Sequence, residues 1–354
     1  MAPDRGVLAH NESVTDEWEA LEREAFRAQE RAVNLPLAVA GAVATTAPLV
    51  VGVAIGNHTL GLVGAIGGLN TALVMSPIAR VRRVAWGAIT AVSGTVAVGV
   101  ATLTHQPWVA VVATLVWSTA WALLRALGPE GTLVGFTTTA VMVIINGLPG
   151  TPGECGTRMA EYAVGSVLAL ALLSIPAATA GHPQPGPIRW SAIADAVREG
   201  GIVRRHAVRV GLVAAATTAL YRALHLTFGY WIPLTAVAVL QPDSRSSRVR
   251  ALQRTAGTLV GTGIVVVVAV ATRNVTALVA IVFVVSGGLF ALKERGYFWL
   301  TMLLTPTALL MTSTVRFYGW DIAVTRLVNT SIGLVIAVAV IEVVGHLRAR
   351  ELDA

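Results

Sequence analysis

The sequence predicts an all-α membrane protein, a polytopic bundle of about twelve transmembrane helices arranged as two parallel six-helix repeats with both termini cytoplasmic. Three observations predict this class: the composition, the spacing of the apolar segments and an internal repeat. Hydrophobic residues make up 55% of the 354 positions and charged residues only 13%, whereas soluble domains are about one-quarter charged. The mean hydropathy is +0.70. The pattern lacks the short alternating strands of a membrane β-barrel, which favours helices.

Apolar segments of membrane-spanning length follow one another along the chain. A helix needs roughly 17 to 22 apolar residues to cross a hydrocarbon core about 30 Å thick. Twelve such segments are expected, at 35–56, 59–76, 84–104, 107–125, 131–149, 159–179, 207–224, 226–240, 254–272, 275–292, 296–314 and 320–344. They divide the chain into a cytoplasmic amphipathic segment (1–31), a first six-helix repeat (32–180), a cytoplasmic linker with a short amphipathic helix (181–205), a second repeat (206–345) and a cytoplasmic tail (346–354).

The N-terminal segment does not resemble a secretory signal, because residues 11–31 are acidic and charged where a signal is basic and then apolar. Thr15 is a suitable N-cap, and Trp18, Leu21 and Ala25 follow at helical spacing. We expect a short amphipathic helix beside the membrane or against a partner. A solvated helical tail is the alternative.

The basic residues predict the orientation of the bundle. Five of the 26 lie on one side of the predicted helices, namely Arg158, Arg222, Arg273, Arg316 and Arg326, and the remaining 21 lie on the other. Cytoplasmic loops carry the excess of Lys and Arg, so the side with 21 is expected to face the cytoplasm. The arginine-rich stretch 240–254 joins two segments on this side and helps to fix it there.

Short motifs recur between the two halves of the chain. The sequence ATTA at 44–47 returns at 216–219, and Gly87 corresponds to Gly257. With a spacing of 168, a set of five residues matches a second set: Gly128, Thr137, Thr139, Arg158 and Gly165 match Gly296, Thr305, Thr307, Arg326 and Gly333. Each half holds an even number of segments, so the halves run in the same direction and are expected to share a pseudo-twofold axis along the membrane normal.

One pair of corresponding segments is short or rich in glycine, which in transporters points to the substrate site. Residues 59–76 contain four glycines together with Asn70. Their partner, 226–240, has only 15 residues and includes Pro233. Asn70 is therefore a candidate for substrate binding.

A second pair of segments, 131–149 and 296–314, concentrates threonines at mid-membrane. Thr137 and Thr305 occupy matching positions, and Pro306 interrupts the second segment. Proline removes an intrahelical hydrogen bond, and threonine hydroxyls can satisfy the freed carbonyl. Both threonines are candidates for the site, and close helix packing by small residues is the alternative explanation.

The composition argues against several other classes. The net charge of +7 is scattered between apolar segments rather than massed on one face, which argues against nucleic-acid binding. The single cysteine, Cys155, argues against a cysteine-based metal site, and the seven histidines show no metal-ligand spacing. Phosphate-loop, nucleophile-elbow and zinc-protease motifs are missing from the sequence. We therefore expect no enzymatic activity, no cofactor and no metal.

Residues 230–264 resemble the signature of the fusaric-acid-resistance and aromatic-acid-exporter family of integral membrane transporters. The resemblance lies in an aromatic-Trp-x-Pro opening, a Gln-Pro-Asp motif, spaced arginines and a Gly-Thr-x-x-Gly motif, here Tyr230, Trp231, Pro233, Gln241, Pro242, Asp243, Arg250, Arg254, Gly257, Thr258 and Gly261. The first half keeps a proline and arginines at the corresponding place but lacks Gln-Pro-Asp.

The resemblance implies export of small organic acids, often aromatic carboxylates, driven by the proton motive force at the plasma membrane. Related plant channels pass malate and similar anions through an arginine-lined pore. A guanidinium stays charged and can grip a carboxylate with a planar fork, so arginines suit an anionic cargo.

Four arginines are candidates for anion binding. Arg250 and Arg254 are four residues apart, so they share a helix face at the cytoplasmic end of their segment. Arg158 and Arg326 occupy corresponding positions in the repeat and lie on the external side, where the positive-inside rule expects few basic residues. The alternative role for both is to extend their side chains to the external lipid headgroups. Glu161, three residues after Arg158, is the candidate for proton coupling.

Two other functions stay open at this point. A passive anion channel would need no group that changes its protonation, and replacing Glu161 by Gln would separate it from a proton-coupled exporter. A membrane scaffold or lipid-binding protein would use the basic cytoplasmic face instead. The expected partners are the lipid bilayer and a small organic anion, with a homodimer as one possible assembly.

Overall fold

The protein is all-α, as its sequence predicts. The computed structural model describes residues 24–26, 33–75, 80–104, 106–148, 150–175 and 187–352. Most of the predicted N-terminal segment, the Pro- and Gly-rich part of the linker and residues 353–354 lie outside these ranges. The α-helices are α2 (Leu35–Ala54), α3 (His58–Val74), α4 (Arg80–Leu103), α5 (Pro107–Ala122), α6 (Pro129–Gly147), α7 (Cys155–Ser174), α8 (Ser191–Glu199), α9 (Ile202–Ala223), α10 (Trp231–Val239), α11 (Ser244–Ala271), α12 (Val275–Leu292), α13 (Tyr297–Val315) and α14 (Asp321–Leu352).

Each of the twelve predicted apolar segments coincides with one of these helices, and α8 is the short helix expected in the linker. Within the described residues, seven helices have the length and hydropathy to span a membrane: α2, α4, α5, α11, α12, α13 and α14. The chain is therefore a polytopic helical membrane protein.

One predicted segment differs from the structure. The crossing predicted at 226–240 contains only the nine residues of α10, about 14 Å of helix. The residues before it form an irregular turn, in which His225 and Phe228 adopt positive φ angles. Within the predicted linker, 181–205, Gly200 ends α8 in the left-handed conformation and α9 begins at Ile202.

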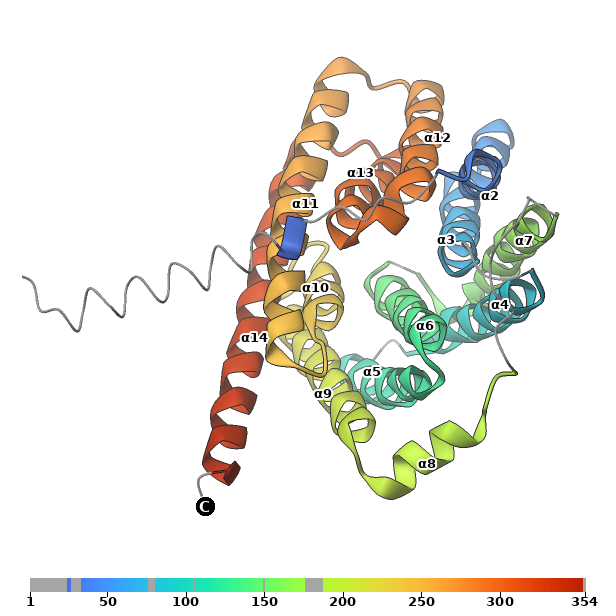
Figure 1. The fold of residues 1–354 in the computed structure, drawn as a ribbon. Helices are drawn as coiled ribbons and strands as arrows, with labels where there is room; N and C mark the ends of the chain where they lie inside the picture. Colours follow the sequence, from blue (N-terminus) through green and yellow to red (C-terminus); the bar gives the residue numbers. More distant parts are fainter. Residues whose placement is uncertain are drawn as a thin grey trace, which may run out of the picture.

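The same helix pairs pack together in each half of the chain. Within the first half, α3 packs against α2 and α7, and α6 packs against α4 and α5; within the second, α10 packs against α9 and α14, and α13 against α11 and α12. The contacts between the halves also correspond in the repeat: α5 packs on α9, and its counterpart α12 packs on α2, the counterpart of α9. Figure 1 shows α11 and α14 side by side along one edge of the bundle, far from α2 and α7.

The recurring motif at a spacing of 168 is visible in the backbone. The short 3-10 helices η1 (Leu123–Leu127) and η3 (Lys293–Arg295) end at Gly128 and Gly296, whose φ angles are 98° and 149°. Only glycine adopts such angles without strain. These two glycines then start α6 and α13, so they set the direction of the helices that carry Thr137 and Thr305.

A second pair of repeat-related glycines allows close helix packing. Gly165 of α7 lies against α3, where an added Cβ would be 1.8 Å from the Gly64 carbonyl oxygen. Gly333 of α14 lies against α10, where an added Cβ would be 2.6 Å from the Ile232 carbonyl oxygen. In each half, the last helix therefore packs directly against the backbone of the second helix: α7 against α3, and α14 against α10.

Replacing Gly165 by Ala should therefore destabilise the protein by about 1–3 kcal/mol, because backbone atoms of α3 and α7 must separate. The matched control is Gly263→Ala on α11, where an added Cβ meets nothing within 4 Å. That change should stabilise the helix by about 1 kcal/mol, the difference in propensity between Gly and Ala. Thermal unfolding of both variants in detergent measures the contrast. Equal melting temperatures would contradict the close approach of α3 and α7.

Candidate functional site

A small cavity of about 90 Å³ lies at the centre of the bundle, between the two halves. Residues from α3, α6, α10 and α13 form most of its wall, and α11 and α14 each contribute an arginine. Five of the residues predicted for substrate binding line it together: Asn70, Thr137, Thr305, Arg254 and Arg326. Tyr230 and Trp231 of the aromatic motif line it as well. None of the described residues lining this cavity is acidic.

Arg326 is the most unusual charge in this cavity. The residue is 2% exposed, and its guanidinium carbon lies 3.6 Å from the centre of the Trp231 ring. A cation stacked on an aromatic face is stabilised by about 2 kcal/mol when both are shielded from water. The Nε and Nη1 atoms of Arg326 have no hydrogen-bond partner among the described residues. The guanidinium is thus buried and stacked, with donors left over for a ligand.

The irregular turn before α10 explains how Arg326 reaches this position. The turn exposes backbone carbonyls that no helix can satisfy, and membrane proteins tolerate this only where protein groups replace water. Asn329 of α14 donates from Nδ2 to the carbonyl oxygens of Thr227 (3.0 Å) and Phe228 (3.1 Å). Arg326 precedes Asn329 by three residues and lies on the same helix face. The contact that holds the turn therefore also places the guanidinium over Trp231.

Arg254 lines the same cavity from α11. It is 5% exposed, its Nη1 lies 3.5 Å from the Tyr297 hydroxyl, and its Nε has no hydrogen-bond partner among the described residues. Gly257 and Gly261 let α11 approach α13 closely, since an added Cβ would lie 2.9 Å and 2.5 Å from the nearest α13 atoms. The glycines of the motif thus bring Arg254 into the centre of the bundle.

The Gln-Pro-Asp motif starts α11. Asp243 is its N-cap and accepts a hydrogen bond of 2.7 Å from the Ser246 amide. Partial burial raises the pKa of the Asp243 carboxyl, but the hydrogen bonds from Ser246 outweigh this and lower the pKa below its usual value. The carboxylate therefore stays charged, and its negative charge interacts favourably with the positive N-terminal end of the α11 dipole. The aspartate of the Gln-Pro-Asp motif thus caps α11.

The polar candidates in the cavity are anchored to their own helices. Asn70 donates to the Ile66 carbonyl at 2.9 Å, Thr137 to Val134 at 3.1 Å and Thr305 to Thr301 at 2.9 Å. Their remaining lone pairs, and the second N–H of Asn70, are left to face the cavity. Asn70 can therefore donate one hydrogen bond to a ligand or water, whereas the two threonine hydroxyls can only accept one.

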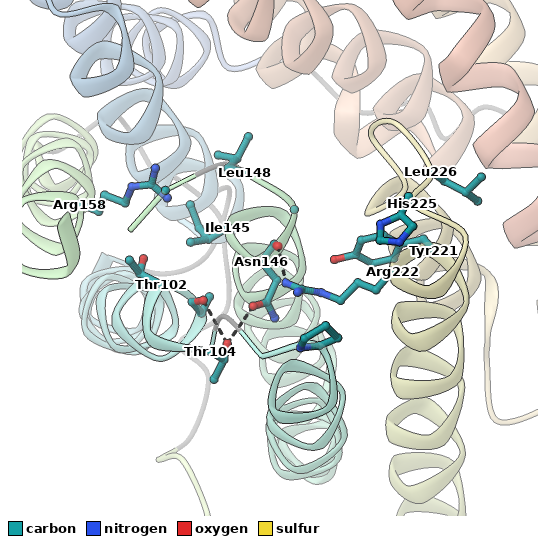
Figure 2. Close-up of a pocket in the computed structure, with 14 residues that line it drawn as sticks. Thr102, Thr104, Ile145, Asn146, Leu148, Arg158, Tyr221, Arg222, His225 and Leu226 are labelled. Carbon is teal, nitrogen blue, oxygen red and sulfur yellow. Dashed lines mark hydrogen bonds between the residues drawn. The ribbon is translucent and has the colours of Figure 1, made fainter. Parts of the chain in front are cut away.

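A larger cavity of about 480 Å³ contains Arg158, which therefore lies apart from the central cavity. Figure 2 shows Arg158 on one wall and Arg222 with His225 on the opposite wall. Arg158 forms an ion pair of 3.0 Å with Glu154, and Arg222 donates to the Asn146 carbonyl at 2.8 Å. Both halves of the chain thus contribute a cation to this larger cavity.

A third cavity, of about 60 Å³, contains Arg250 together with Arg125, His206 and Gln241. The guanidinium of Arg250 lies 4.7 Å from the centre of the Tyr297 ring. Arg250 and Arg254 therefore occupy two neighbouring cavities, although they share one face of α11. Tyr297 contacts both arginines, through its ring and its hydroxyl.

Comparison with known protein families finds a match to the second half of the chain. A family model described as "Fusaric acid resistance protein-like" matches residues 214–340, which include α10, both cavity arginines and the Gln-Pro-Asp motif. Residues 214–340 are thus similar to this family. The match supports the resemblance seen in the sequence, and it covers α10, α11, α13 and α14 of the central cavity but not α3 and α6.

Three curated proteins are similar to part of this chain. An uncharacterized protein ORF2 of Neisseria gonorrhoeae is 33% identical over 152 residues, 43% of this chain and 36% of the relative. The inner membrane protein YccS of Escherichia coli is 32% identical over 137 residues, 39% of this chain and 19% of the relative. The uncharacterized protein YhfK of Escherichia coli is 28% identical over 136 residues, 38% and 19% of the two chains.

The chain thus spans about a third or less of the length of these relatives. No solved structure matches the fold. The similarity to an inner membrane protein and the seven apolar helices together place this chain in the inner (plasma) membrane as a multi-pass protein.

The structure places Glu161 away from the three cavities. It lies half-buried on α7, and none of the described lining sets includes it. Its repeat counterpart, at the spacing of 168, is Asn329, the residue that satisfies the turn before α10. Glu161 lies three residues after Arg158, which lines the larger cavity, and its role in proton coupling stays a prediction from sequence.

Several residues of the cavities were not among the sequence candidates. They include Arg222, which the sequence only places on the side opposite the cytoplasm, and His225 and Arg125. Arg222, like Arg158, is a basic residue on the side where the positive-inside rule expects few, and this could have identified it as a candidate. Tyr297 gave no signal beyond its place after Gly296.

The burial of Arg326 predicts an effect on stability in the absence of any ligand. Arg326→Met should raise the melting temperature by a few degrees, because a buried guanidinium with unpartnered donors costs free energy that an apolar side chain does not. Arg158→Met should lower it, because that change breaks the ion pair with Glu154. Thermal unfolding of the two variants in the same detergent, free of organic anions, compares them. A lower melting temperature for Arg326→Met would show that the cation is already satisfied.

Proposed function

We propose that this protein transports small organic anions, with aromatic carboxylates as the best-fitting class, out of the cell across the inner membrane, driven by the proton motive force. The observation that carries the proposal is the buried Arg326 guanidinium, stacked on Trp231 and left with two unpartnered donors. Arg254 adds a second positive charge to the same cavity, and no described lining residue compensates it. An anion would complete this site.

The lining favours an anion with an aromatic body. Hydrogen bonds to a carboxylate from an ionised donor are about twice as strong as neutral ones, and arginine provides them in a planar arrangement. Next to the two arginines, the wall is apolar and aromatic, with Tyr230, Trp231 and leucines of α3 and α13. A carboxylate at the arginines would therefore leave its ring against these side chains.

The three cavities suggest a route through the bundle. In the proposed topology, twelve segments cross the membrane as two parallel six-helix repeats with both termini cytoplasmic. The cavity of Arg250 then lies toward the cytoplasm, that of Arg326 and Arg254 at the centre, and that of Arg158 and Arg222 toward the outside. Each step would pass the anion from one cation to the next. In this proposal the protein is not an enzyme and needs no cofactor.

The test is uptake of labelled 4-hydroxybenzoate into inside-out vesicles that contain the purified protein. A pH gradient and a membrane voltage are imposed separately, for wild type, Arg326→Gln and the control Arg273→Gln, whose arginine is exposed in the loop after α11. A lost charged hydrogen bond costs about 1.5–3 kcal/mol, so we expect Arg326→Gln to reduce uptake about 10- to 100-fold and the control to retain it.

The two driving forces separate the functions. Accumulation that requires the pH gradient and disappears in Arg326→Gln supports the exporter. Voltage-driven flux without proton dependence would indicate a passive channel instead. The proposal fails if wild type moves none of a broad set of organic anions, which would favour a scaffold or lipid-binding role.

A further inference from the structure

Lys293 is the only lysine among the 26 basic residues, and it is buried where the two halves meet. Its side chain is 5% exposed, and its Nζ donates to the carbonyl oxygen of Leu73 at 2.5 Å. Leu73 lies in the last turn of α3, where carbonyls lack intrahelical partners, and the residue four positions on is Pro77, which has no N–H. The ammonium group from the second half therefore caps a helix of the first half.

Arg125 makes the corresponding contact in the opposite direction. It precedes Lys293 by 168 residues, the spacing of the internal repeat, and lies in η1 as Lys293 lies in η3. Its Nη1 and Nη2 atoms both lie 3.4 Å from Oε1 of Gln241, just after the end of α10. Each half thus extends one cation to the end of the short helix in the other half.

The two cations differ in one chemical property. A guanidinium keeps its proton under all conditions met in proteins, whereas a lysine ammonium can release one. A neutral Lys293 amine would keep at most a weak hydrogen bond to Leu73 and would lose its ion pair with Glu294, at 3.7 Å. The end of α3 would then be held less firmly.

The end of α3 also borders the central cavity. Leu73, which accepts the hydrogen bond from Lys293, lines this cavity together with Leu69 and Asn70 on the same helix. A change in how α3 is held would therefore change the space beside Arg326. Protonation of Lys293 and binding of an anion in the cavity would therefore both affect the position of the C-terminal end of α3.

We propose that Lys293 is the proton-carrying residue that couples anion movement to the proton gradient, a role that rests on the proposed transport function. The protonated side chain holds α3 against the cavity, and release of the proton frees the helix end. The ionisable neighbours on the packed elements are Glu294 and Arg295 of η3 and Tyr297 of α13. Helix α12 contributes none, and α3 contributes only His58 at its opposite end.

The first experiment compares two transport modes in the same vesicles. One is accumulation of labelled 4-hydroxybenzoate driven by a pH gradient, and the other is exchange of labelled for unlabelled anion at equal pH. Lys293→Arg keeps the positive charge but cannot release the proton, so we expect exchange within about twofold of wild type and loss of accumulation. Arg273→Lys, in the exposed loop after α11, is the matched control and should retain both modes, and Glu161→Gln tests the sequence-based candidate in the same vesicles.

The outcomes distinguish this inference from the proposed function. If Lys293→Arg accumulates the anion like wild type, Lys293 is not the coupling residue. If Glu161→Gln alone loses accumulation, the sequence-based candidate replaces it. If wild type shows neither accumulation nor exchange, the transport function itself is wrong.

A second experiment covers the case in which Lys293→Arg loses both modes. Growth on lysine carrying ¹³C at the ε position labels only Lys293, because the chain has no other lysine. The Lys293 resonance, assigned by its absence in Lys293→Arg, is titrated with and without 4-hydroxybenzoate. Because coupled sites influence each other reciprocally, the midpoint of the titration should shift when the anion binds. An unchanged midpoint in protein that binds the anion would overturn the inference.

Discussion

A nine-residue helix covers less than half of a hydrocarbon core, so the backbone around α10 must find its partners inside the protein. Helix α14 supplies them along one face. Asn329 satisfies the carbonyls of the preceding turn, Gly333 allows backbone contact with α10, and Arg326 stacks on Trp231. The contact that keeps the broken segment folded is therefore also the contact that puts a cation at the centre of the bundle.

The two halves share a backbone plan but differ in chemistry. Arg158 is paired with Glu154 and faces the larger cavity, whereas its counterpart Arg326 lies over an aromatic ring with donors to spare. Helix α3, the counterpart of α10, contains no aromatic residue, so the first half has no equivalent of Trp231. The first half provides the frame and one wall, and the second half provides the charged site. The family match over residues 214–340 covers that second half.

The sequence was enough to locate the helices, because long apolar runs separated by charged loops have few other arrangements. It offered seven candidates for anion binding, of which five line one cavity in the structure, namely Asn70, Thr137, Thr305, Arg254 and Arg326. The other two, Arg158 and Arg250, line two separate cavities, and nothing in the sequence distinguishes them from the five. It did not show that the residues before α10 leave the helix, because Leu226 and Phe228 are as apolar as a helical segment requires. Contacts such as Lys293 with Leu73 join residues 220 apart, and no local pattern indicates them.

The size of the central cavity has a consequence for the rate at which such a protein can work. At about 90 Å³ it is well below the roughly 300–1,000 Å³ of typical small-molecule sites. In the proposed transport, an organic anion must therefore wait for helices to part around it, a motion of microseconds to milliseconds. The proposed turnover is then limited by conformational change rather than by diffusion, as in a carrier.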